Sequence, residues 1–242
     1  MEFYTEDNKK IFIPDTILNN KVTNGHCGDI YELNSKLYLK IYKNIPITEE
    51  AKLNTTLYKI LKEIEHSNLG IIIEILFKEQ NKFHYTADAY LIKKYLEYYQ
   101  DFLELPKEYI ITNFEKLFEL NKICSMKQIR YRDLKRENTL FTKENMVLID
   151  LDFSEIVRDL SYHELLKVNN SKISSLFYNM TLESLKTKHY KLLRENNLCD
   201  YVIASKLFPI TTNSNRSMKV LTKRLKDYNR PIDYVDSLKN KF

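Results

Sequence analysis

The stretch YRDLKREN at residues 131–138, followed after a short hairpin by LIDLDF at residues 148–153, decides how this chain is interpreted. It places Asp133 and Asn138 on one turn and Asp150 shortly after the next strand. Asp133 can accept a proton from an attacking hydroxyl, while Asn138 and Asp150 offer the hard oxygen ligands that Mg²⁺ prefers. The chemistry that uses these groups together is phosphoryl transfer, which depends on positioning and charge neutralisation more than on covalent steps.

These segments resemble the catalytic loop of protein kinases, H-R-D-L-x-x-x-N, and the metal-binding D-F-G motif that follows it. Lys135 stands two residues after the aspartate, as in Ser/Thr protein kinases, whereas small-molecule phosphotransferases usually read H-G-D-L-H there. The resemblance implies that Asp133 and Lys135 are catalytic. It also implies that Asn138 and Asp150 bind Mg²⁺.

A strand–turn–strand pattern upstream surrounds Gly25 and Gly28, and the chain has only three glycines in all. The alternating stretch at residues 36–42 then carries Lys40. This arrangement resembles the kinase nucleotide cradle, G-x-G-x-x-G-x-V followed by V-A-I-K. Glycines there let backbone N–H groups approach phosphate oxygens, and the lysine supplies positive charge. The resemblance therefore implies that ATP is bound by Gly25, Gly28 and Lys40.

Some loop positions depart from the kinase pattern. Tyr131 replaces the usual histidine, Leu151 and Asp152 replace Phe-Gly, and Thr23 replaces the first glycine of the cradle. The family's histidine is structural, and we expect the Tyr131 hydroxyl to support the loop backbone in its place.

Other departures concern the nucleotide pocket. The glutamate that kinases pair with the cradle lysine falls on Leu57, although Glu50 lies two turns earlier on the same predicted helix. Tyr38 occupies the place of the small alanine in V-A-I-K, and Lys93 falls at the back of the pocket. Either the strand register differs from the family's, or the pocket is unusual.

The pattern predicts an α+β, two-lobed, protein-kinase-like fold. Residues 1–95 form an antiparallel sheet with one helix, residues 96–242 form a mainly helical lobe, and the hinge lies near residues 95–105. Apolar periodicity and turn signals set the predicted elements. The predicted strands are 10–14, 21–23, 29–33, 36–42, 70–77 and 83–92, with a hairpin at 139–149. The predicted helices are 48–66, 106–124, 159–168, 171–196 with a break near Thr181, 198–206, and 216–241 broken at Pro231.

Composition is that of a globular protein, with 43% hydrophobic and 29% charged residues among 242. The net charge of +5 is dispersed, and the basic stretch at residues 216–226 is typical of a solvated helix face, so no nucleic-acid partner is indicated. There is no long apolar run, no signal-peptide pattern and no CxxC, which predicts a cytoplasmic protein without a membrane or zinc site. The sequence does not indicate an oligomeric state.

Three functions fit these observations. The first is an active ATP-dependent kinase acting on a protein Ser/Thr hydroxyl. The second is a small-molecule kinase of the aminoglycoside or choline type, favoured by the short segment after Asp150 and the missing A-P-E motif. The third is a pseudokinase that serves as a binding module, favoured by Leu57, Tyr38 and Lys93 in or beside the nucleotide pocket.

Overall fold

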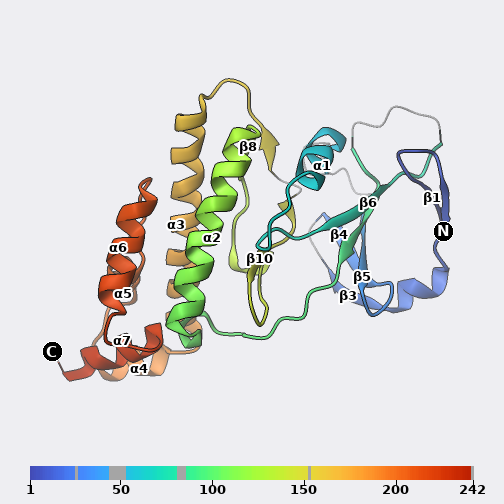
Figure 1. Ribbon diagram of the computed structural model, residues 1–242. Coiled ribbons are helices and arrows are strands. Elements are labelled where there is room, and N and C mark those ends of the chain that lie inside the picture. Colours follow the sequence, from blue (N-terminus) through green and yellow to red (C-terminus); the bar gives the residue numbers. More distant parts are fainter. Residues whose placement is uncertain (25–26, 44–52, 81–85, 152–153, 241–242) are drawn as a thin grey trace.

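The computed structural model describes residues 1–24, 27–43, 53–80, 86–151 and 154–240 (Figure 1). The fold is α+β, with an antiparallel sheet in the N-terminal part and helices in the C-terminal part, which confirms the predicted class. The main sheet has five strands. In spatial order they are β3 (Lys21–Asn24), β4 (Gly28–Glu32), β5 (Leu37–Tyr42), β7 (Ala89–Lys93) and β6 (Ile72–Leu76).

Alternation along β5 divides its side chains between two environments, because successive residues of a strand point to opposite faces. Leu39 packs into a small core with Phe3 and Ile13 from the N-terminal segment. That segment forms a separate hairpin of β1 (Glu2–Tyr4) and β2 (Lys10–Phe12), of which only the second strand was predicted. Lys40 lies on the opposite face of β5, toward the helical part of the molecule.

Helix α1 (Thr55–Lys62) begins later than the sequence predicts. The side chain of Asn54 accepts hydrogen bonds from the backbone N–H groups of Thr56 and Leu57, which makes Asn54 the N-cap. The residue before it, Leu53, is not helical. The prediction of one helix over residues 48–66 is therefore wrong at its start, and the predicted cap Thr48 lies outside the described residues.

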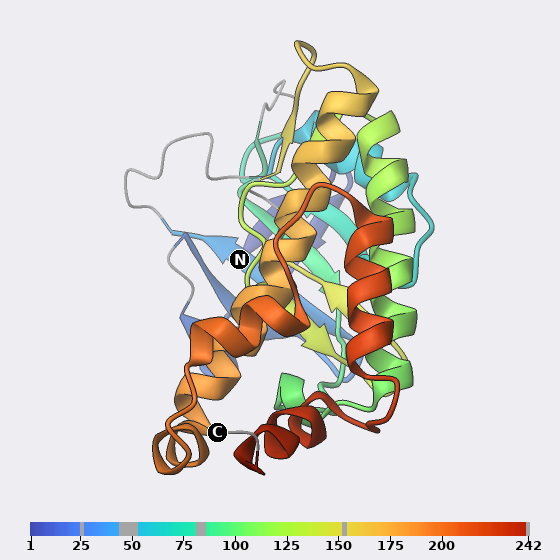
Figure 2. The ribbon, with the colours of Figure 1, turned by 90° about the vertical axis from the view of Figure 1, so that its left-hand side faces the viewer.

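The helical part is built around two long helices, α2 (Lys107–Met126) and α3 (Tyr162–Thr187), which pack side by side (Figures 1 and 2). No helix within the described residues is both long and apolar enough to cross a bilayer. The shorter helices are α4 (Tyr190–Glu195), α5 (Asp200–Leu207), α6 (Ser214–Arg224) and α7 (Pro231–Asp236), and 3₁₀ turns lie at Asp15–Asn19, Phe102–Glu104, Arg136–Asn138 and Ser237–Asn240.

Helix α3 runs unbroken through 26 residues, so the predicted interruptions near residues 169–170 and at Thr181 are wrong. Asn169 and Asn170 disfavour a helix in isolation, but both are buried and satisfied by other elements. Asn169 accepts from the Tyr131 N–H at 3.1 Å, and Asn170 donates to the Thr212 carbonyl at 3.1 Å. The Thr181 hydroxyl donates to the Phe177 carbonyl one turn back, which keeps it within the helix.

Two small antiparallel strand pairs connect the long helices to the candidate site. Strand β8 (Ile129–Arg130) pairs with β11 (Glu155–Ile156), and β9 (Thr139–Phe141) pairs with β10 (Met146–Leu148). The first pair joins the chain before residue 131 to the chain after residue 154, and the second is a hairpin between Asn138 and Asp150.

Buried amides join the sheet side of the molecule to the helical side. Asn68, between α1 and β6, donates to Asn113 Oδ1 of α2 at 2.8 Å and to the Met146 carbonyl at 2.7 Å. Asn113 Oδ1 also accepts from the Met146 N–H at 2.7 Å. Asn68 and Asn113 are both fully buried. The three hydrogen bonds therefore hold α2, β10 and the segment before β6 at one relative position.

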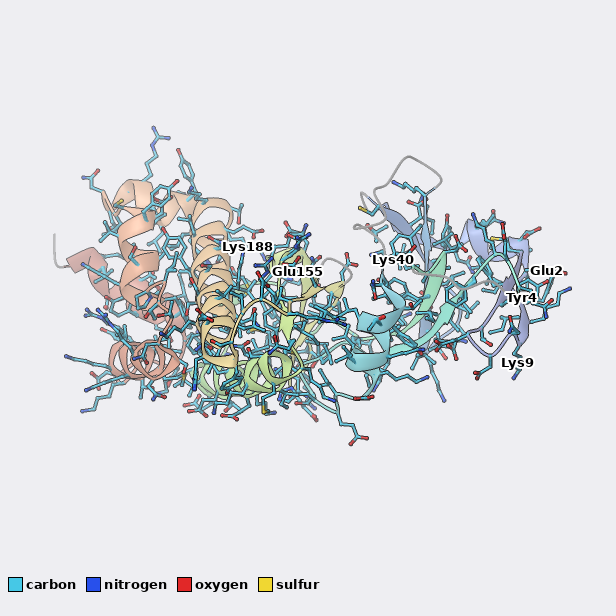
Figure 3. The ribbon with its side chains drawn as sticks, turned by 90° about the horizontal axis from the view of Figure 1, so that it is seen from above. Glu2, Tyr4, Lys9, Lys40, Glu155 and Lys188 are labelled. Atoms are coloured by element: carbon cyan, nitrogen blue, oxygen red, sulfur yellow. The ribbon has the colours of Figure 1, made fainter. Side chains whose placement is uncertain are left out.

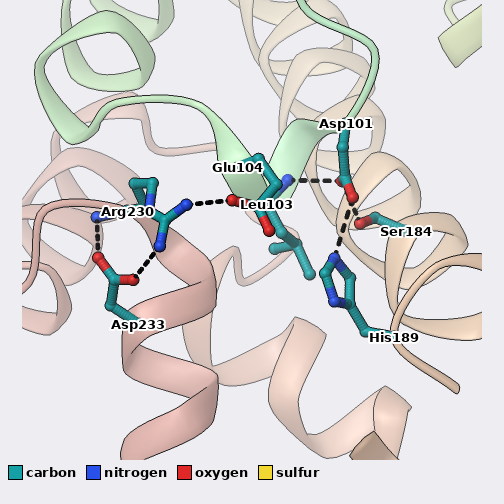
Figure 4. A network of polar contacts seen from close by, with 7 residues as sticks. All are labelled: Asp101, Leu103, Glu104, Ser184, His189, Arg230 and Asp233. Carbon is teal, nitrogen blue, oxygen red and sulfur yellow. Dashed lines mark hydrogen bonds and ion pairs between the residues drawn. The ribbon is translucent and has the colours of Figure 1, made fainter. Parts of the chain in front are cut away.

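The segment that connects the sheet to α2 is tied to the C-terminal helices (Figure 4). Asp101 accepts from the Leu103 N–H at 3.0 Å and from the Ser184 hydroxyl, and its Oδ2 lies 2.9 Å from His189 Nε2. Arg230, at the start of α7, pairs with Glu104 on the other side of the same turn. The connection is thus fastened at both ends of its 3₁₀ turn.

Replacing Asn113 with Ala should lower the free energy of unfolding by about 3 kcal/mol. The change leaves one N–H of the buried Asn68 amide and the N–H of Met146 without their Asn113 acceptor, and each such group costs about 1–3 kcal/mol. Denaturant unfolding followed by circular dichroism measures the change. Asn196→Ala is the matched control, because Asn196 is half-buried and, among the described residues, its side chain bonds only to the Leu192 carbonyl one turn back. Equal losses in both variants would contradict the role given to Asn113.

Candidate active site

The centre of the candidate site is an ion pair between Lys40 of β5 and Asp150, which follows β10. The two residues are 110 positions apart in the sequence. Lys40 is only 3% exposed, whereas the Asp150 side chain is 29% exposed. Figure 3 shows Lys40 at the inner side of the sheet, facing the helical part. The pair therefore lies where the two parts of the molecule meet, with its carboxylate on the more open side.

Asp150 has a left-handed backbone, with φ of 57°. Few residues other than glycine adopt this region, and aspartate and asparagine are among those that tolerate it. The backbone strain at such positions is characteristic of functional sites.

Asp133, Lys135 and Asn138 lie together on the turn before β9. The Lys135 amine is 2.6 Å from Asp133 Oδ2. Asn138 donates its amide to the Asp133 carbonyl at 3.0 Å and to Asp133 Oδ2 at 3.3 Å. Because the amide nitrogen is used in this way, the Asn138 side-chain oxygen is the end left to face a cation.

This turn is coupled to Asp150 through backbone and charge. The Ile149 N–H donates to the Asn138 carbonyl at 2.8 Å, which fixes Asn138 beside the residue that precedes Asp150. The pKa of the Lys135 amine is raised by its hydrogen bond with Asp133, and the nearby Asp150 carboxylate adds to the effect. Lys135 thus stays protonated, and a single site contains Lys40, Asp150 and the 133–138 turn.

Gly28 lies at the first position of β4, opposite Tyr42, while Gly25 falls outside the described residues. A Cβ atom at Gly28 would stand 2.8 Å from the Ile41 carbonyl oxygen and 3.3 Å from Lys40 Cε. Only a glycine therefore lets the β4 backbone approach the Ile41 carbonyl of β5 this closely. In the described part of the chain, the physical requirement at Gly28 is this backbone contact, and the Lys40 side chain lies beside it.

The sequence left open whether the strand register places Lys93 in the pocket, and the pairing of β5 with β7 decides this. Lys93 is opposite Leu37, while Tyr90 is opposite Lys40. Directly paired residues share a face, so Lys93 belongs to the face opposite Lys40 and is exposed. The placement of Lys93 at the back of the pocket is therefore wrong, and Ile92 shares the face of Lys40 instead.

The other two unusual positions, Tyr38 and Leu57, lie in different surroundings. Tyr38 shares the face of Lys40, and the Lys94 amine lies 5.3 Å from the centre of its ring. Leu57 is buried in the main core, and α1 contains no acidic residue. Glu50 lies outside the described residues.

Tyr131 is fully buried, but its hydroxyl does not support the loop backbone within the described residues. It lies near the Cys124 thiol, and burial raises the pKa of that thiol to about 11. The loop backbone is held instead by Asn169, which accepts from the Tyr131 N–H. The expectation that the Tyr131 hydroxyl supports the loop backbone is thus wrong.

Sequence reasoning missed Glu155 and Tyr90. Glu155 bridges Arg132, at 2.6 Å, and Arg130, and Figure 3 shows it beside the helical part. This bridge ties the segment after Asp150 to the segment before the 133–138 turn. Tyr90 contacts both Lys40 and Asp150. The pairing of β7 with β5 was the signal that could have identified Tyr90, since it lies directly opposite Lys40.

The oxygen donors available here suit a cation that arrives with its own ligands. Among the described residues, no group of three or more His, Cys, Asp and Glu could hold a metal ion. Mg²⁺ is usually bound by one or two protein oxygens together with substrate phosphates. Asn138 and Asp150 fit that requirement.

The sequence matches no protein-family model, and a search of curated proteins finds no relative. Function must therefore be argued from the site itself.

Replacing Gly28 with Ala should lower the free energy of unfolding by about 1–3 kcal/mol, the usual cost of overpacking a tight site. The added methyl must displace either the Ile41 carbonyl or the Lys40 stem. Denaturant titration measures the loss, and Ser35→Ala, an exposed change in the turn of the same hairpin, is the control. A Gly28→Ala protein as stable as the control variant would show that the close approach is not required.

Proposed function

We propose that this chain is an ATP-dependent phosphotransferase of the protein-kinase-like fold, and that its acceptor is a hydroxyl group, by preference a protein Ser or Thr. The observation that carries the proposal is the Lys40–Asp150 ion pair, which joins the sheet to the helical part beside the turn of Asp133, Lys135 and Asn138. A cation and a carboxylate that face each other from separate structural parts form a suitable site for a metal-bound triphosphate.

Each residue then has a distinct role. Lys40 binds the α and β phosphates, and the backbone around Gly25 and Gly28 covers the phosphates. Asp133 orients the acceptor hydroxyl and takes its proton, while Lys135 neutralises charge on the transferring phosphoryl group.

Asn138 and Asp150 are the residues that would hold Mg²⁺, and the bound ion would supply charge neutralisation at the phosphates. Asp150 pairs directly with Lys40, so the proposed metal-binding carboxylate and the proposed phosphate-binding amine lie side by side.

A small-molecule hydroxyl is the second candidate acceptor. Its support is the short connection from Asp150 to α3, which begins at Tyr162; among the described residues of this connection the one strand is the two-residue β11. Lys135 supports the protein acceptor instead. Incubation with labelled ATP, alone and then with generic protein substrates or aminoglycosides, separates the two acceptors.

Mg-ATP should raise the melting temperature of the protein, and Asp150→Asn should abolish the Mg²⁺-dependent part of that rise. Ligand at a hundredfold excess over Kd stabilises the folded state by about 2.7 kcal/mol, which is on the order of 5 °C for a chain of this size. Asparagine tolerates the left-handed backbone at this position, but it removes the counter-charge of the buried Lys40. The rise is therefore measured from each variant's own melting temperature without ligand.

Asp159→Asn, an exposed change in the segment before α3, is the matched control for the thermal shift. No shift of the wild-type protein at millimolar Mg-ATP would contradict nucleotide binding altogether. A shift without phosphoryl transfer would favour the pseudokinase alternative.

Asp133→Asn should leave the Mg-ATP thermal shift in place and reduce phosphoryl transfer by about 10²–10⁴-fold, the usual contribution of a general base. The hydrogen bond from Asn138 to the Asp133 carbonyl is made to the backbone, so it survives the change. Transfer of labelled phosphate is the measurement. Undiminished transfer would remove Asp133 from the mechanism.

A further inference from the structure

Two tyrosine rings enclose the Lys40 amine. Tyr90 lies directly opposite Lys40 in the β5–β7 register, and Tyr42 lies two residues further along β5 on the same face. The Lys40 Nζ atom is 5.5 Å from the centre of each ring. The ring centres are 6.0 Å apart and the rings are inclined at 55°. A cation within about 6 Å of a ring face is attracted by it, so both rings favour the charged amine.

The Tyr90 hydroxyl also reaches the carboxylate. It donates to Asp150 Oδ1 at 3.4 Å, and this is the oxygen that pairs with Lys40. The separation is longer than the usual O–H···O distance of about 2.7–2.8 Å, so the contact orients the carboxylate more than it binds it. Tyr90 therefore contacts both members of the ion pair, its ring facing the cation and its hydroxyl facing the anion.

Tyr90 lies on the buried side of the site. Tyr90 is 1% exposed, so its ring cannot turn toward solvent. Beside it is a cavity of about 10 Å³, lined by Tyr90 and Asp150 together with apolar side chains such as Ile72 and Leu148. That volume holds about one water molecule at most, so this cavity itself takes no organic ligand.

We propose that Tyr90 is a positioning residue of this site: its ring holds the Lys40 amine, and its hydroxyl orients the Asp150 carboxylate against that amine. One side chain thus sets the separation between the phosphate-binding cation and the metal-binding oxygen. Tyr42 forms the second wall, and its hydroxyl accepts from the Leu53 N–H at 2.8 Å, which anchors the ring. The inference rests on the proposed function for what Lys40 and Asp150 bind. The contacts among the three residues do not depend on it.

Two substitutions separate the ring from the hydroxyl. Tyr90→Phe keeps the ring beside Lys40 and removes only the contact with Asp150, whereas Tyr90→Leu removes both. Tyr58→Phe is the matched control, because Tyr58 is equally buried and its hydroxyl contacts the Ile73 carbonyl and Glu74, on the edge strand β6.

The experiment uses the full chain and two readouts. One is ATP affinity by calorimetry with and without Mg²⁺, and the other is the rate at which acetic anhydride labels Lys40 without nucleotide, followed by peptide mass spectrometry. In Tyr90→Phe, the gain in ATP affinity from Mg²⁺ should fall about tenfold, the scale of a hydrogen bond to a charged group. Its Mg²⁺-free affinity and Lys40 labelling should stay within about twofold. In Tyr90→Leu, Lys40 should be labelled at least about fivefold faster, the scale of a lost cation–π contact.

Equal labelling of Lys40 in wild type and Tyr90→Leu would overturn the proposal, as would an unchanged Mg²⁺ gain in Tyr90→Phe. A merely structural role would weaken ATP binding equally with and without Mg²⁺, which also counts against it. If wild-type protein binds no ATP, the proposed function fails, and the labelling comparison alone then decides whether Tyr90 positions Lys40.

Discussion

A lysine amine that is only 3% exposed needs a counter-charge nearby, because removing a charged group from water costs several kcal/mol. Asp150 supplies that charge from the other part of the molecule. The two partners come from different parts, so the ion pair can form only while the sheet and the helical part keep one relative position. If that position were lost, each charge would be left without its partner. The relative position of the two parts and the charge balance of Lys40 therefore depend on each other.

Neutral groups hold that relative position. The bonds among Asn68, Asn113 and Met146 join amides to amides, so salt does not screen them as it screens exposed charges. Gly70 adds a close backbone contact, because a Cβ atom there would lie 2.8 Å from the Leu148 carbonyl oxygen. The Gly70 N–H donates to that same oxygen at 2.7 Å. The relative position of the sheet and the helical part is consequently set by backbone and amide geometry, and the ion pair forms within that arrangement.

The sequence predicted the features that depend on local spacing. Asp133, Lys135 and Asn138 lie within one turn, so their proximity follows from sequence distance alone. Alternation along residues 36–42 predicted a strand but did not say which residue of β7 lies opposite Lys40. A shift of one residue reverses every side chain in a strand, which is why Lys93 was misplaced and Tyr90 was missed.

Helix boundaries failed for a related reason. Asn169 and Asn170 read as helix breakers, and only the hydrogen-bond partners contributed by residues far away in sequence make them compatible with α3. Local propensity is a weak prior that tertiary contacts override. The same contact that rescues the helix, from the Tyr131 N–H to Asn169, fixes the start of the 131–138 stretch. Asn169 thus belongs to the helix whose interruption was wrongly predicted and also holds the start of the 131–138 stretch.

Glu155 shows how so short a segment after Asp150 keeps its place. Its carboxylate lies between the guanidinium groups of Arg130 and Arg132, and its backbone pairs with Arg130 across β8 and β11. Arg132 immediately precedes Asp133, so the clamp links the two sides of the site through adjacent residues. Carboxylate–guanidinium pairs are strong when their geometry is constrained, and here the strand pairing constrains it. The clamp therefore ties the segment after Asp150 to the residue next to Asp133.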